Sequence, residues 1–197
     1  LRNPKRFNEK IQWYKLYYRD PLMVQCADKY GVRDYVKSKD LEDILVSLYG
    51  VYNNSDEIDF NSLPEKFVFK TNNGSHTNLI CENKSKLNIN HTKEKLDLWV
   101  KKRTSKAGRE WAYYDIEPKI ICEEFLETDE EFGSVDDKIY CFNGEPKYIK
   151  VAIDTNGEKG PKNGIFDMDF KQLPYYRNEA GRITEKIKKP QNFEKMC

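Results

Sequence analysis

The sequence has few histidines and cysteines and no long apolar segment. Its 197 residues include two histidines and five cysteines, and no two cysteines have the CxxC spacing. The odd number and wide spacing argue against a disulfide scaffold or a zinc site, and favour the reducing cytoplasm. No apolar run approaches the roughly 18–20 residues of a membrane span, and no signal peptide is found. We therefore expect no integral membrane segment.

An excess of charge of one sign is also missing. The chain has 34 basic and 33 acidic residues, a net charge of +1. Such a protein has no overall field to attract nucleic acid, so we expect no nucleic-acid partner. Aromatic residues make up 13% of the chain, which argues against disorder. The length allows one large domain or two small ones.

The order of the predicted elements indicates an α+β protein, with a mainly helical N-terminal part followed by antiparallel hairpins. Helices are predicted over Phe7–Arg19, after Asp20-Pro21 and through Val32–Val36, and a later helix is expected to be capped by Thr92. Asn143-Gly144 is the strongest hairpin signal. Cys81, Cys122 and Cys141 are expected to be buried in strands. The predicted strands are Ile44–Tyr52, Phe67–Phe69, Leu79–Cys81, Pro118–Leu126, Asp137–Phe142, Pro146–Val151 and Ile165–Phe170.

A polar loop separates the predicted strands Phe67–Phe69 and Leu79–Cys81. It is rich in Asn, Gly, Ser and Thr, residues that form tight turns and tolerate positive φ. Successive loop N–H groups can bind an anion, and Lys70 at the end of the first strand can reach a phosphate. The Walker A pattern is absent. The loop therefore predicts either a phosphate-covering hairpin or an ordinary polar hairpin with an exposed lysine.

Three further patterns each allow two interpretations. Lys29 and Arg33 are four residues apart, so they could grip a phosphate or form a solvated basic face. Cys81 and His76 could approach across a hairpin as a nucleophilic pair, although a strand cysteine is usually buried and inert. Asp167-Met168-Asp169 could hold a divalent metal on a sugar diphosphate, or simply form a turn.

Several segments in sequence order together resemble one family, the TupA-like branch of the ATP-grasp superfamily. These proteins occur in bacterial polysaccharide gene clusters and are often labelled glycosyltransferases. The resemblance covers nearly the whole chain. The segments are Phe7–Trp13, Arg19–Leu22, Ala27–Tyr30, Arg33–Val36, Leu63-Pro64, Phe67–Lys70, Gly108–Trp111, Glu123–Leu126 and Cys141–Lys147.

The resemblance implies an ATP-grasp fold, in which two α+β subdomains hold ATP between their sheets. The expected divisions are a helical part at 1–60, a subdomain with the lid loop at 61–126, and a second subdomain at 127–197. The residues that the resemblance assigns to ATP are Lys29 and Lys70 at the phosphates, Gly74, Ser75, His76 and Thr77 in the lid, Glu123, Glu124, Phe125 and Leu126 in the hinge at the adenine, Glu130 at the ribose, and Lys138 as a further phosphate contact.

One departure from the family pattern concerns the metal. Family members continue past the equivalent of Asn192–Glu194 into a strand pair that carries acidic Mg²⁺ ligands, whereas this sequence ends at Cys197. We therefore expect a C-terminally truncated second subdomain, and no metal ligand or catalytic residue is assigned.

The leading functional hypothesis is an ATP-dependent carboxylate–amine ligase that uses ATP and Mg²⁺ and forms an acylphosphate. Its substrate would be a small molecule or polysaccharide precursor in the biosynthesis of capsule, teichuronopeptide-like polymer or O-antigen, and the enzyme could associate peripherally with the membrane. The alternatives are a nucleotide-sugar glycosyltransferase and a non-catalytic binding domain. The oligomeric state stays open.

Overall fold

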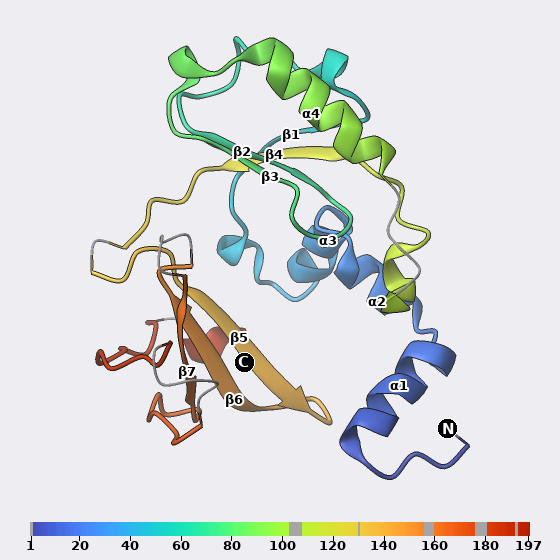
Figure 1. Cartoon of the computed structure of the whole chain (residues 1–197), viewed down its shortest axis with the longest axis vertical. Helices are drawn as coiled ribbons and strands as arrows, with labels where there is room; N and C mark the ends of the chain where they lie inside the picture. Colours follow the sequence, from blue (N-terminus) through green and yellow to red (C-terminus); the bar gives the residue numbers. More distant parts are fainter. Residues whose placement is uncertain (1, 103–107, 130, 156–159, 176–180, 192) are drawn as a thin grey trace. The chain divides into compact units, whose positions relative to one another are not determined.

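The computed structural model describes residues 2–102, 108–129, 131–155, 160–175, 181–191 and 193–197. The chain divides into two compact units, Leu1–Phe125 and Leu126–Cys197, which are coloured in sequence order in Figure 1. Helices and antiparallel sheets occur together, which confirms the predicted α+β class.

The first unit begins with three short helices. They are α1 (Phe7–Tyr17), α2 (Pro21–Ala27) and α3 (Gly31–Lys37). The Asp20 carboxylate accepts a hydrogen bond from the Leu22 N–H at 2.9 Å, and Pro21 occupies the first helical position, as the sequence predicts for the start of α2.

A four-stranded antiparallel sheet forms the centre of this unit, with strand order β1-β4-β2-β3. The strands are β1 (Leu48–Tyr52), β2 (Phe67–Thr71), β3 (Asn78–Cys81) and β4 (Ile120–Glu124). Short 3-10 turns lie at Glu42–Ile44 (η1), Ser55–Glu57 (η2), Lys84–Lys86 (η3) and Trp111–Tyr113 (η5).

The two faces of this sheet differ. Phe67, Phe69 and Cys122 pack in a core with Leu96 of α4 (Ile89–Lys101), and Figure 1 shows α4 lying over that side. Side chains alternate along a strand, and Phe69 pairs with Cys122. Lys70 of β2 and Glu123 of β4 therefore lie on the opposite face.

The second unit contains a three-stranded antiparallel sheet in the order β5-β6-β7 and the short helix α5 (Phe193–Met196). The strands are β5 (Asp136–Phe142), β6 (Glu145–Ile153) and β7 (Lys162–Phe166). Asn143 and Gly144 between β5 and β6 have φ of 53° and 81°, the left-handed pair of a two-residue hairpin turn, as predicted. The core contains Ile149, Val151, Phe166, Phe170 and Phe193.

Two local predictions are wrong. Helix α4 begins a turn earlier than expected, because the Asn88 side chain caps it by accepting from the His91 N–H at 3.0 Å, while Thr92 is buried. Cys81 and Cys122 are buried as predicted, but Cys141 is exposed because it lies next to the Asn143-Gly144 turn of the β5–β6 hairpin, where the neighbouring side chains of β5 are exposed as well.

Asn72 joins distant segments of the first unit. Its side chain is fully buried, and its amide donates to Asp28 Oδ1 and to the Glu117 carbonyl, each at 3.0 Å. Its side-chain oxygen accepts from the Lys119 N–H at 2.7 Å, and its backbone carbonyl accepts from the Lys29 N–H at 3.0 Å. Asn72 therefore connects the end of β2, the α2–α3 junction and the start of β4.

We expect Asn72→Ala to lower the free energy of unfolding by roughly 2 kcal/mol, because the Asp28 carboxylate, the Glu117 carbonyl and the Lys119 N–H each lose a hydrogen bond from a fully buried side chain. Urea denaturation of the purified chain measures this. Asn90→Ala, at an exposed position of α4, is the control and should change stability by less than about 0.5 kcal/mol. Equal stability of the two variants would contradict the role of Asn72.

Candidate functional site

A charged cluster occupies the sheet face opposite α4. Glu123 is 6% exposed and accepts from two cations: Lys70 Nζ at 2.9 Å and an Arg33 guanidinium nitrogen at 3.4 Å. Arg33 projects from α3 and also donates to the Val46 carbonyl at 2.7 Å. A carboxylate buried to this degree requires paired charges and hydrogen bonds, which explains why both cations are held close to it.

Lys29 lies beside this cluster. Its amine donates to the carbonyls of Thr71 at 3.2 Å and Gly74 at 2.5 Å. Burial lowers the pKa of Lys29 below its ordinary value of 10.5, and the Lys70 ammonium lowers it further, while Glu123 and Asp28 act in the opposite direction. Lys29, Lys70 and Arg33 thus place three positive charges near two carboxylates, Glu123 and Asp28, so the cluster has a net positive charge that suits an anion.

The loop after β2 is shaped by left-handed residues. Gly74 has φ of 79° and His76 has φ of 64°, a conformation that glycine adopts freely and other residues adopt at a cost of about 1–2 kcal/mol. The Thr71 hydroxyl donates to the Asn73 carbonyl at 3.1 Å and lies 2.6 Å from the Thr77 hydroxyl. These contacts tie the two ends of the loop together.

This loop borders a cavity of about 510 Å³, called here the loop cavity. Its other walls come from the end of α4 and from the segment before β4. Lys102 adds a basic side chain, and the backbone N–H groups of a turn of this kind can bind an anion. The lining residues are Thr71, Asn73, Gly74, Ser75, His76, Thr77, Trp99, Lys102, Glu110 and Tyr113.

The predicted hinge residues lie where the two compact units meet in sequence, since one unit ends at Phe125 and the next begins at Leu126. Glu124 is held by Ser47: its carboxylate accepts from the Ser47 hydroxyl at 2.7 Å, and its N–H donates to the Ser47 carbonyl at 2.9 Å. The Ser47 hydroxyl lowers the pKa of Glu124, and the Ser47 N–H, which donates to the same carboxylate oxygen at 3.3 Å, lowers it further. The Phe125 ring lies 5.5 Å from the Lys66 ammonium, and Leu126 is exposed.

The structure thus brings together Lys29, Lys70, Glu123 and the loop of Gly74, Ser75, His76 and Thr77 within one unit. Lys138 belongs to the other unit, where it is exposed on β5 and paired with Asp136. The predicted ribose contact Glu130 lies outside the described residues.

Two alternative sites receive little support from the structure. The Asp167 carboxylate accepts from the N–H groups of Asp169 at 3.0 Å and Lys171 at 2.9 Å, which is the turn interpretation of the DxD pattern. Cys81 is buried, its thiol lies 3.9 Å from the Glu65 carbonyl, and burial raises its pKa. Such a thiol is unreactive.

Sequence reasoning missed several contributors. Asn72 was counted as a loop residue, whereas it is fully buried. Lys102, Glu110 and Tyr113 were not assigned to any site, although all three line the loop cavity. The partners of these residues are distant in sequence, so spacing offered no signal. Among the described residues, no group of three or more His, Cys, Asp or Glu side chains is arranged to hold a metal ion.

We expect Glu123→Gln to reduce the free energy of unfolding by roughly 3 kcal/mol, because removing one partner of a buried ion pair leaves the other charges uncompensated. The exposed Glu82→Gln is the matched control. Thermal and urea unfolding of both variants measure the difference, and an effect of Glu123→Gln no larger than that of the control would show that the cluster does not depend on this carboxylate.

Comparison with known protein families finds a match. The family model described as TupA-like ATPgrasp matches residues 9–197. No curated protein and no solved structure is significantly similar to the chain. Because the matched region covers nearly the whole sequence, and the structure has the expected α+β composition, the chain belongs to the TupA-like ATP-grasp family.

Proposed function

We propose that this protein is an ATP-dependent carboxylate–amine ligase that acts in the biosynthesis of a bacterial cell-surface polysaccharide. The observation that carries the proposal is the group of three cations around Glu123, next to a loop with two left-handed residues, in a chain of the ATP-grasp family. A triphosphate is the ligand that such a positive, donor-rich surface suits.

The proposed roles of the residues come from the family resemblance, and the positions of Lys29, Lys70 and the loop support their part in it. Lys70 and Lys29 contact the phosphates, and the loop of Gly74, Ser75, His76 and Thr77 covers them. The Glu124 N–H is already bound to the Ser47 carbonyl, so the backbone of Phe125 and Leu126 is left to hold the adenine edge. Glu130 binds the ribose hydroxyls and Lys138 supplies a further basic contact. No residue is assigned to Mg²⁺.

Lys70 has to exchange partners when a nucleotide binds. In this structure its ammonium donates to Glu123 at 2.9 Å. Arg33 holds the other oxygen of that carboxylate, so Glu123 keeps one charged partner when Lys70 turns to a phosphate oxygen. Arg33 thereby lowers the cost of the exchange, because the carboxylate is not left buried and unpaired.

In the proposed reaction an acceptor carboxylate oxygen attacks the γ-phosphorus of ATP, the bond to the bridging oxygen breaks, and ADP leaves. An amine nitrogen then attacks the carbonyl carbon of the acylphosphate, phosphate leaves, and the amine proton passes to solvent. The cations of the site stabilise the charge that develops on the phosphoryl group, and the loop excludes water from the acylphosphate.

The substrate class and the cellular location of this activity are proposed from the family alone. The substrate is a small molecule or polysaccharide precursor, and the protein works in the cytoplasm, where ATP is available. None of the described helices combines the length and the apolar character needed to cross a membrane.

A nucleotide-sugar glycosyltransferase is the alternative function. Its sequence support was the Asp167-Met168-Asp169 pattern, but Asp167 already accepts two backbone hydrogen bonds within a turn. The ligase is therefore the function that the described residues favour.

Calorimetric titration with a non-hydrolysable ATP analogue and Mg²⁺ tests the proposal, with UDP-glucose titrated in parallel. We expect the analogue to bind and Lys70→Ala to weaken binding about 10–100-fold, because one charge-assisted contact to a phosphate is lost. Lys86→Ala, at an exposed position of η3, should bind like the wild type. Binding of UDP-glucose without binding of the analogue would refute the ligase proposal.

A further inference from the structure

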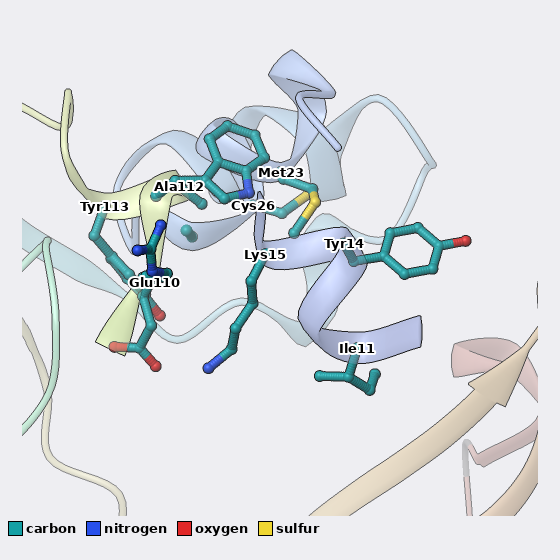
Figure 2. A pocket seen from close by; sticks show the side chains of 11 residues that line it. Ile11, Tyr14, Lys15, Met23, Cys26, Glu110, Ala112 and Tyr113 are labelled. Carbon is teal, nitrogen blue, oxygen red and sulfur yellow. The ribbon is translucent and has the colours of Figure 1, made fainter. Parts of the chain in front are cut away.

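A second cavity, called here the apolar cavity, lies in the first unit between α1, α2 and the segment 108–113. Its volume is about 450 Å³ (Figure 2). Glu110 and Tyr113 line both this cavity and the loop cavity, so the two are neighbours that share a wall. The lining residues are Ile11, Tyr14, Lys15, Met23, Cys26, Ala27, Arg109, Glu110, Trp111, Ala112 and Tyr113.

The segment 108–113 contacts one residue of α1 and one residue that follows α1. The Lys15 amine donates to the Gly108 carbonyl at 3.0 Å, and the Arg19 guanidinium lies 4.7 Å from the centre of the Trp111 ring. Arg19 also donates to the carbonyls of Leu16 and Tyr18 at the end of α1. These contacts fix the segment 108–113, which forms one wall of the apolar cavity, relative to α1. The Gly108–Trp111 motif of the sequence lies in this wall.

Uncharged side chains line one end of the apolar cavity. Figure 2 shows Met23 and Cys26 at its upper end, whereas Ile11 of α1 lies on the lower side of the cavity. Ala112 is buried and also lines the cavity. Such a lining favours an aliphatic or aromatic group through removal of apolar surface from water and through sulfur–aromatic contact.

Charges of both signs also line the apolar cavity. Lys15 and Arg109 are cationic and Glu110 is anionic, and none of the three forms an ion pair with another residue that the structure describes. Figure 2 shows the side chains of Lys15 and Glu110 extending towards the lower edge, away from Met23 and Cys26. Cations and a carboxylate that are not paired with one another complement a ligand with both an anionic and a cationic group.

We propose that the apolar cavity binds the amine substrate of the ligase, and that this substrate is an α-amino acid, or a compound with the same zwitterionic group, with a large apolar side chain. Glu110 holds the ammonium, Lys15 and Arg109 hold the carboxylate, and the side chain enters the apolar end. Because Glu110 also borders the loop cavity, the amine is held at the wall next to the phosphates. This inference rests on the proposed function.

Protection of Cys26 from alkylation tests the inference. Cys26 lines the apolar cavity and is exposed, whereas Cys141 is exposed in the other unit and serves as the internal control. Iodoacetamide labelling of the full chain is followed by peptide mass spectrometry, with and without 10 mM L-phenylalanine or L-leucine. N-acetyl-L-phenylalanine, phenethylamine and glycine are the comparison compounds.

We expect either amino acid to slow alkylation of Cys26 at least threefold and to leave Cys141 unchanged. Blocking the amine, removing the carboxylate or removing the side chain should abolish the protection. Glu110→Gln should lose it, while Glu82→Gln should retain it. Absence of Cys26 protection, or equal protection by the N-acetylated compound, would overturn the inference.

The two proposals fail in different experiments. If the ATP analogue binds but Cys26 is not protected, the apolar cavity is not the amino-acid site, and the ligase proposal is unaffected. If Cys26 is protected but the analogue does not bind, the apolar cavity binds amino acids and the ligase proposal is refuted.

Discussion

The buried amide of Asn72 is the interaction on which the site depends. It bonds to Asp28, Glu117 and Lys119, which lie 44, 45 and 47 residues away in sequence. Its own carbonyl holds the Lys29 N–H. One residue therefore sets where the α2–α3 junction, the end of β2 and the start of β4 meet. The loop from Asn73 to Thr77 leaves the sheet from this fixed point.

The electrostatic arrangement follows from that geometry. Asn72 places Lys29 next to the loop, where its amine caps the Thr71 and Gly74 carbonyls. The sheet places Lys70 diagonally across from Glu123, and α3 adds Arg33 from the same side. A cluster with more cations than carboxylates is unfavourable when no anion is bound, because like charges repel where water is scarce. An anionic ligand reduces that repulsion, so the same cost favours the nucleotide binding that we propose.

Local sequence signals predicted the local structure well. Asp20-Pro21 begins a helix and Asn143-Gly144 forms a hairpin, because the residues that decide each feature are adjacent. Lys70 could be placed at the end of a strand before the loop. The family resemblance, confirmed by the match over residues 9–197, supplied the fold that local patterns could not.

The contacts of the site could not be read from the sequence in the same way. Arg33 and Glu123 are 90 residues apart, and no spacing rule connects a helix to a strand at that distance. Strand patterns also cannot tell a buried hairpin from an exposed one, which is why Cys141 was wrongly expected to be buried. The shared wall at Glu110 and Tyr113 depends on how α1 and α2 pack against the segment 108–113.

The most direct test of this account is the pKa of the Lys29 amine, measured by NMR on lysine-labelled protein with Lys29→Arg used for assignment. The account predicts a pKa below the ordinary value of 10.5 in the free protein, because of burial and of Lys70. It predicts a rise when the ATP analogue and Mg²⁺ are added, since phosphate oxygens favour the charged amine, with no change at the exposed Lys86. An unchanged pKa of Lys29 at saturating nucleotide would contradict the placement of the phosphates beside Lys29.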